Sequence, residues 1–158
     1  MQPATYFFAS LSSFLGILIG SVLIRIAPEE QKPLGKYFTL IKKILLALAF
    51  AFLLLFYFGK WLYFIGLTLL AASTFLTEYK AKSMPNRLIA AYIILGILFF
   101  LSSKNINLLA IESSIVLLYG AAAASLEFDK KKPFKMFFYG IGFVTISSIL
   151  YLVTISHF

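Results

Sequence analysis

The sequence contains no cysteine, one histidine and only six acidic residues in 158 positions. Without cysteine, the chain has no disulfides, thiol catalysis or thiolate metal sites, and its redox compartment stays undetermined. The single histidine, His157, cannot supply the pair of histidines that a helical zinc-protease motif needs. The single aspartate, Asp129, likewise excludes a protease that works with two buried aspartates. Because no Gly-rich phosphate loop and no acidic metal cluster occurs either, we expect no enzyme, no cofactor and no metal.

Charge is scarce throughout the chain, since 13% of its residues are charged and 61% are hydrophobic. Soluble domains have about 25% charged and 45–50% apolar residues. The apolar residues form long unbroken runs, which is typical of a membrane protein. No polar stretch is long enough to form a soluble core, so we predict a single integral membrane domain over residues 1–158.

Six apolar segments predict an all-α fold, a polytopic transmembrane helical bundle. The expected spans are residues 4–26, 44–58, 61–77, 88–103, 106–126 and 134–156. No Lys or Arg precedes the first segment and no small-residue cleavage site follows it, so we expect a retained span and not a signal peptide. Only Gly59 and Lys60 separate the second and third spans, which are therefore expected to be antiparallel neighbours.

The basic residues are divided unevenly between the two sides of this predicted bundle. Connections 25–43, 78–87 and 130–135 hold 12 of the 14 Lys and Arg residues, and the remaining two are Lys60 and Lys104. In short loops this bias sets the orientation of the chain. The basic loops are therefore predicted to be cytoplasmic, with both termini outside, in a multi-pass protein of the cell membrane.

The net charge of +8 is explained by this topology, so no nucleic-acid partner is expected. The expected partners are the bilayer and its anionic phospholipid head groups. The residues predicted to contact those head groups are Lys130, Lys131, Lys132 and Lys135. At the opposite interface, Tyr57, Trp61 and Tyr63 are expected to form an aromatic belt.

The longest polar connection, residues 27–43, contains Pro28 and Pro33, which are both expected to break the helix. Beyond them, residues 34–43 alternate apolar and basic positions at helical spacing. This pattern fits two structures equally well. One is a short amphipathic helix on the membrane surface, and the other is an extension of the second span into the head groups.

The fifth segment is expected to be the packed, central helix, and it carries the one acid that lies away from an interface, Glu112. Fifteen residues separate Glu112 from Glu127, or about 22 Å along a helix axis. Within a hydrocarbon core of roughly 30 Å, that distance places the carboxylate inside the outer third. An intramembrane carboxylate is by default a candidate functional group. We therefore predict an ion- or substrate-binding site at Glu112, Ser113 and Ser114.

A structural role for Glu112 stays open at this point. The carboxyl could instead bond to Ser113, to a hydroxyl on a neighbouring span, or to Lys60 or Lys104 at the outer turns. Small residues predict close helix packing in lipid, and those singled out are Gly16, Gly20 and Gly120. Asn105 is a candidate N-cap for the fifth helix.

Two functions are compatible with these features. The first is a small ion or solute transporter or channel-like protein with Glu112 as the coupling carboxylate. Spans one, three, five and six would then line the polar path, and spans two and four would face lipid. The alternative is a non-transporting scaffold, insertion factor or structural subunit that offers Gly16 and Gly20 as its contact face. Either would form a homo-oligomer or join a membrane-protein partner, and no motif points to a particular family.

Overall fold

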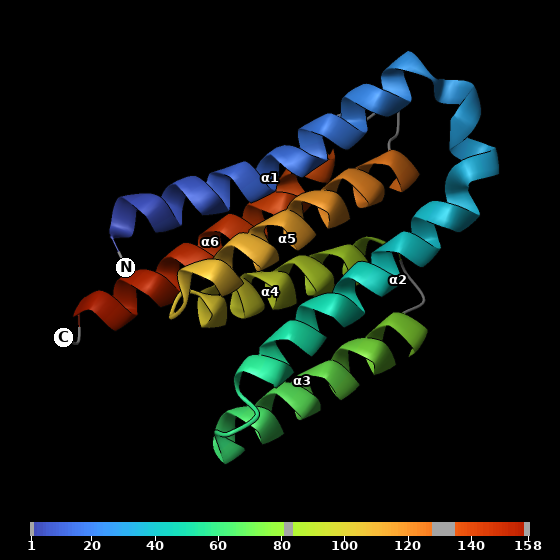
Figure 1. The fold of residues 1–158 in the computed structure, drawn as a ribbon. Coiled ribbons are helices and arrows are strands. Elements are labelled where there is room, and N and C mark those ends of the chain that lie inside the picture. The colour runs from blue at the N-terminus through green and yellow to red at the C-terminus, as the bar shows by residue number, and fades with distance from the viewer. Residues whose placement is uncertain (1, 81–83, 128–134, 157–158) are drawn as a thin grey trace.

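The structure is a computed structural model that describes residues 2–80, 84–127 and 135–156. Within these ranges it contains six α-helices, one short 3-10 helix and no strand, which confirms the all-α prediction. The elements are α1 Pro3–Ile26, η1 Pro28–Glu30, α2 Gln31–Phe56, α3 Trp61–Lys80, α4 Met84–Ser102, α5 Ile106–Glu127 and α6 Lys135–Ser156. Figure 1 shows the helices running side by side in one elongated bundle.

Three stretches are long and apolar enough to cross a membrane by length and composition, namely Pro3–Ile26, Pro28–Phe56 and Ile106–Leu126. Shorter apolar stretches occupy Trp61–Leu76, Leu88–Ser102 and Gly140–Thr154. These are the stretches in which the sequence predicts spans. The described chain is thus a helical protein whose apolar helices are compatible with a membrane protein.

Helix α5 occupies the centre of the bundle, as its small residues predict. It packs most extensively against α1 and α2, and it also contacts α4 and α6. Helix α4 packs mainly against α6, whereas α3 makes few contacts, on α2 and α4. In Figure 1, α3 accordingly lies at the edge of the bundle.

The prediction that the fourth span faces lipid is wrong, because Leu95 and Phe99 on α4 are fully buried. The third span is largely exposed, with Leu62 and Leu69 on α3 at 85% and 66%. The hydroxyl of Thr68 on α3 donates to a carbonyl of its own helix. Helix α4 is therefore interior, whereas much of α3 faces away from the bundle. A helix that is apolar all round carries no sequence signal for its buried face, which is why the sequence misleads here.

The prediction that Pro33 breaks the helix is also wrong. Pro28 begins η1, but Pro33 lies within the first turn of α2, where a backbone N–H has no intrahelical acceptor to lose. Helix α2 continues unbroken from Gln31 to Phe56, so residues 34–43 extend the second predicted span. In Figure 1 this first part of α2 curves before the helix runs back along the bundle.

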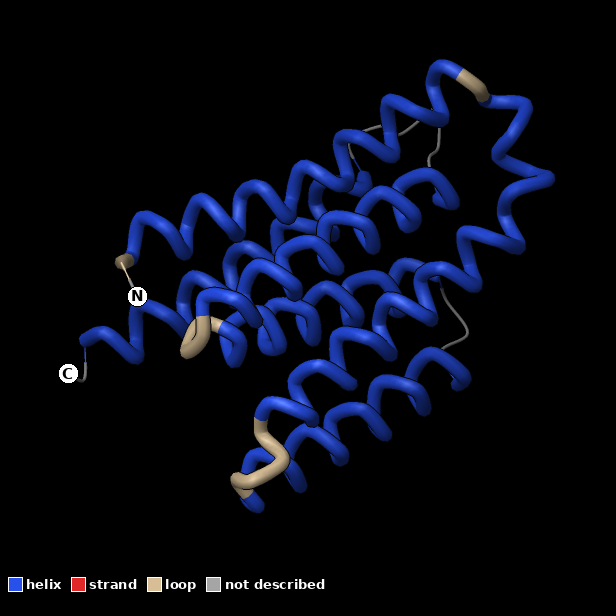
Figure 2. The backbone as a smooth tube through the Cα atoms, viewed as in Figure 1, coloured by secondary structure: helices blue, strands red, loops and turns tan. Residues whose placement is uncertain are grey.

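The turns that join α2 to α3 and α4 to α5 are short, as the loop segments in Figure 2 show. Asn105 caps α5, because its Oδ1 accepts hydrogen bonds from the backbone N–H groups of Asn107 (2.9 Å) and Leu108 (3.3 Å). The amino end of α1 and the carboxyl end of α6 lie at the same end of the bundle (Figure 1).

Candidate functional site

Three glycines allow α1 and α5 to pack closely, and this contact positions the candidate site on α5. A Cβ atom added to Gly16 would overlap the carbonyl oxygen of Leu117, and one added to Gly20 would overlap that of Ala121. From the other side, a Cβ on Gly120 would come within 3.2 Å of the backbone nitrogen of Ile17. The two backbones therefore touch, which is the close approach that small residues permit between helices in lipid.

The same contact shows that α1 and α5 are parallel. Ser13 meets Ser113, Gly16 meets Leu117 and Gly20 meets Ala121, so both chains advance together. Helix α6 is antiparallel to α1. Tyr6 contacts Ser147, and Ile17, which comes later in α1, lies next to Gly140, which comes earlier in α6.

Two serines form the polar part of the α1–α5 contact. The hydroxyl oxygens of Ser13 and Ser113 lie 2.9 Å apart, and both reach the carbonyl oxygen of Ala9, at 2.8 and 3.4 Å. Ser13 is buried and Ser113 is half-buried. This pair uses side-chain and backbone partners together, so none of its hydroxyl groups is left without an acceptor.

A second polar contact joins α1 to α6. The Tyr6 hydroxyl donates to the carbonyl oxygen of Ser147 at 3.1 Å, and the hydroxyl oxygens of Ser10 and Ser147 lie 3.4 Å apart. The Tyr6 ring stacks on Tyr151, with centroids 4.0 Å apart. Five hydroxyl side chains thus form a hydroxyl cluster where α1 contacts α5 and α6, and all but the half-buried Ser113 are buried. The cluster consists of Tyr6, Ser10, Ser13, Ser113 and Ser147.

Glu112 is fully buried, with none of its surface exposed. Neither carboxyl oxygen has a hydrogen-bond partner in the described structure. The hydrogen bonds expected for a structural role, to Ser113, to a hydroxyl on a neighbouring span or to Lys60 or Lys104, are therefore not made in the described structure. Ser113 bonds to Ser13 instead, and the ammonium of Lys104 donates to the Tyr63 hydroxyl at 3.1 Å.

The register of α2 and α4 places apolar side chains at the level of Glu112. One level of the bundle is marked by Tyr119, whose ring lies edge-on to Tyr92 of α4 and 5.6 Å from the Lys42 ammonium of α2. Both helices are antiparallel to α5. Glu112 lies seven residues before Tyr119, so the residues seven positions after Tyr92 and Lys42, which are Phe99 and Ala49, lie at its level. Those side chains are fully buried and offer no polar atom.

The predicted site is only partly assembled by the fold. Ser113 faces α1 beside Glu112, but Ser114 is exposed and its hydroxyl donates to the Ala110 carbonyl one turn earlier, at 2.9 Å. The sequence-based site omitted Tyr6, Ser10, Ser13 and Ser147. Ser10 and Ser13 could have been included, because they lie on the same face as Gly16 and Gly20, whereas nothing in the sequence pairs Ser147 with α1.

The lysines predicted to contact head groups are not described in detail. Lys130, Lys131 and Lys132 lie outside the described residues, and the side chain of Lys135, at the start of α6, is likewise not described. Their contact with anionic lipid stays a prediction.

Comparison with known proteins gives no family for this arrangement. No protein-family model, no curated protein and no solved structure matches the chain.

Proposed function

We propose that this protein is a six-span integral membrane protein that carries an ion or small solute, with Glu112 as the group that takes up and releases a proton or cation. Each of its six helices has at least 19 residues, or about 28 Å of length, which suits a hydrocarbon core of roughly 30 Å. The parallel α1 and α5 and the antiparallel α6 fit a chain that crosses the bilayer at every helix.

The observation that carries this proposal is the buried, unpaired carboxyl of Glu112. Burying a neutral carboxyl costs far less than burying a carboxylate, so the closed arrangement suits the proton-loaded form. Release of the proton would then require water or a cation to reach Glu112. A packed interior with one such acid next to a hydroxyl cluster favours a closed, loaded state of a carrier over an open channel.

The alternative is a non-transporting structural subunit, scaffold or insertion factor. Its predicted contact face was the Gly16 and Gly20 surface, but α5 of the same chain covers both glycines. That face is not available to a partner, so this role loses the feature that favoured it.

Flux measurements with the purified chain in proteoliposomes test the role of Glu112. We expect Glu112→Gln to abolish pH-dependent flux while the melting temperature changes little, because the amide keeps the size but does not titrate. Glu112→Asp should retain part of the flux. Ser114→Ala is the matched control, since Ser114 is exposed and bonds only within its own helix. Wild-type flux in the Gln variant would contradict the proposal, and no flux of any ion or solute in wild type would favour the structural subunit.

The proposed threading has a separate test that exploits the absence of native cysteine. Single cysteines at Lys60, Lys104 or His157 should react with an impermeant thiol reagent from outside the cell. Cysteines at Lys32, Lys82 or Lys131 should react only after the membrane is opened. The reverse pattern would overturn the orientation, whatever the result for Glu112.

A further inference from the structure

An apolar groove lies on the outer side of the bundle, where α3 meets α4. Its volume is about 370 Å³. The residues that line it are Leu62, Tyr63, Gly66, Leu67, Leu70, Ile97 and Leu101. Gly66 opens the middle of the groove, because a Cβ atom added there would meet no other atom within 4 Å. Glu112 is not among the lining residues, so this groove is distinct from the site described above.

One end of the groove is closed by two tyrosines. The rings of Tyr57 and Tyr63 stack with centroids 4.8 Å apart and an interplanar angle of 18°. The Tyr57 hydroxyl donates to the carbonyl oxygen of Leu101, a lining residue, at 2.8 Å. This end of the groove is therefore a built structure of aromatic rings, at the interface where the sequence predicts an aromatic belt.

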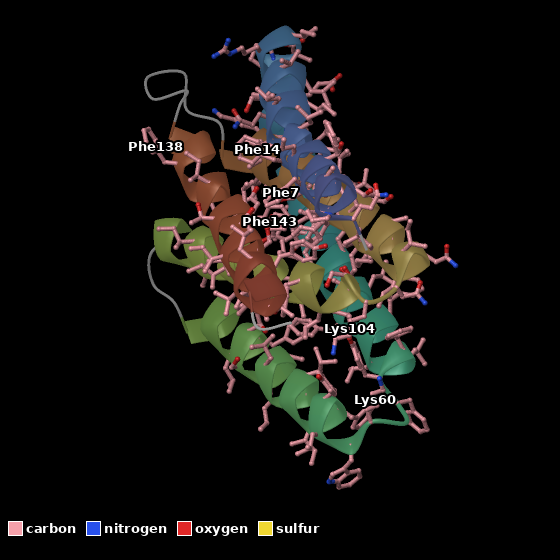
Figure 3. All side chains as sticks on the ribbon, turned by 90° about the vertical axis from the view of Figure 1, so that its left-hand side faces the viewer. Phe7, Phe14, Lys60, Lys104, Phe138 and Phe143 are labelled. Atoms are coloured by element: carbon pink, nitrogen blue, oxygen red, sulfur yellow. The ribbon has the colours of Figure 1, made fainter. Side chains whose placement is uncertain are left out.

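Two lysines stand at this aromatic end. The Lys104 ammonium donates to the Tyr63 hydroxyl and lies 4.9 Å from the centre of that ring. The Lys60 ammonium lies 5.8 Å from the centre of the Tyr57 ring. Figure 3 shows Lys60 and Lys104 on the same side of the bundle, near its α2–α3 end. The two tyrosines thus hold both cations at this end of the groove.

No described carboxylate balances these two charges. The acids whose side chains the structure describes are Glu29, Glu30 and Glu112. Glu29 and Glu30 precede α2, whose 26 residues put about 39 Å between them and Lys60. Glu112 is enclosed in the core. Lys60 and Lys104 are exposed, so their N–H groups can meet an anion from outside the chain.

We propose that the α3–α4 groove binds an anionic phospholipid, with an acyl chain against Leu67 and Leu70 and the phosphate at Lys60 and Lys104. An apolar slot that ends in aromatic rings and two cations matches the three parts of such a lipid in order: chain, interface and anionic head group. This inference depends on the membrane placement proposed above but not on any role of Glu112.

The size of the groove favours a lipid chain over a protein partner. Its volume is about 370 Å³, and its lining is apolar apart from the Tyr63 hydroxyl, so it suits a narrow, flexible apolar chain. The two cations at one end suit the anionic head group that such a chain carries.

The chain offers its own reporter for this site. Trp61 is the single tryptophan, it is 75% exposed, and it lies between Lys60 and the first lining residue. The purified full-length chain is reconstituted into phosphatidylcholine bilayers that contain increasing fractions of brominated phosphatidylglycerol. Bromine quenches tryptophan fluorescence on contact, so quenching measures occupancy near Trp61. The same titration with brominated phosphatidylcholine gives the relative affinity for the anionic lipid.

We expect wild type to prefer the anionic lipid. Each lysine near an anionic group contributes about fivefold in affinity, so Lys60→Gln with Lys104→Gln should remove most of this preference. The matched control is Lys36→Gln with Lys43→Gln, which removes two exposed lysines from the first half of α2 and should leave the preference unchanged. High salt should weaken the wild-type preference.

A separate variant tests the apolar part of the groove, where the acyl chain would bind. Gly66→Leu should fill the groove and reduce anionic quenching although both lysines remain. Gly142→Leu is its control, because a Cβ at Gly142 on α6 also meets no atom within 4 Å and no residue of α6 lines the groove.

Three results would overturn the proposal. They are equal quenching of wild type by both lipids, an unchanged preference in the double-lysine variant, and a Gly66→Cys protein that forms disulfide-linked pairs in the bilayer. The last result would mean that a second copy of the chain covers the groove. None of them bears on flux through Glu112, so the two proposals fail independently.

Discussion

The α1–α5 pair and helix α3 contrast two ways in which an apolar helix is accommodated. In the pair, Gly16 and Gly20 bring the two backbones into contact. The hydroxyls of Ser13 and Ser113 bond across this α1–α5 interface, which is called the seam below. Helix α3 has a glycine as well, but Gly66 faces open space and its helix packs only lightly. A glycine in a membrane helix therefore indicates close packing only when the partner helix also presents small residues, as α5 does around Gly120.

The α1–α5 pair and α3 also differ in how strongly packing and hydrogen bonds hold them in the bundle. Lipid chains are as apolar as leucine, so burial of apolar surface does not hold membrane helices together; packing and hydrogen bonds do. The α1–α5 seam has both. Helix α3 has neither across its exposed face, and its hydroxyls at Thr68 and Ser73 bond only within the helix. We expect α3 to be the helix whose position costs least to disturb.

The largest effect should come from filling the seam. Gly16→Leu would drive a side chain into the Leu117 carbonyl, and overpacking of this kind costs about 1–3 kcal/mol or prevents folding. Gly66→Leu on α3 has room for its side chain and should change the free energy of unfolding by less than about 0.5 kcal/mol. Thermal unfolding in detergent measures both. Equal losses would show that the two glycines do not differ as described.

An effect of opposite sign, and no larger, is expected at Glu112. Burying a polar group without a hydrogen bond costs about 1–3 kcal/mol in proteins, so Glu112→Leu should stabilise the fold by up to that amount. Ser13→Leu is a useful contrast, because it removes a bonded group from the same level and should destabilise. A loss of stability in Glu112→Leu would mean that the carboxyl has a partner after all.

The serine bond across the seam should contribute less. Hydrogen bonds between membrane helices average about 0.6 kcal/mol in double-mutant cycles. A cycle of Ser13→Ala and Ser113→Ala should therefore give a coupling energy near that value, measured by unfolding in mixed detergent. The same cycle with Ser13→Ala and Ser114→Ala should give none, since Ser114 bonds only to Ala110.

The smallest effect belongs to the rim of the α3–α4 groove. The hydrogen bond to the Tyr63 hydroxyl raises the pKa of the Lys104 ammonium above its usual value of 10.5. A group whose pKa is raised on folding stabilises the fold fully below its unfolded pKa and loses that contribution as pH rises through the folded pKa. Tyr63→Phe should thus cost a few tenths of a kcal/mol near neutral pH and nothing at strongly alkaline pH. A cost that is constant with pH would point to packing of the ring instead.

The sequence predicts the helices of this protein well and their neighbours poorly. Helix positions follow from long apolar runs, and the central place of α5 follows from its small residues. The pairing of α1 with α5 could not be predicted from the sequence, because the pattern Gly16-x-x-x-Gly20 indicates a close-packing face but not which helix packs against it. The inward place of α4 was missed for the same reason, since Leu and Phe suit lipid and protein interior alike.

For the candidate site, the sequence identified the acid but not its surroundings. Glu112 stands out because a charge inside an apolar run is costly and rare. Its apolar surroundings include Ala49 and Phe99, which reach its level only through the register of α2, α4 and α5. The contact between Ser10 and Ser147 bridges 137 positions of sequence, and no local pattern encodes such a pairing.

The pairing of α1 with α5 has a consequence for how the protein is made. Ser13 and Ser113 are 100 residues apart, so at about 5–20 residues per second the ribosome needs roughly 5–20 s to supply the partner of α1. During that interval the glycine and serine face of α1 stays uncovered. Helix α1 is therefore made long before its partner, and assembly of this part of the bundle waits on α5.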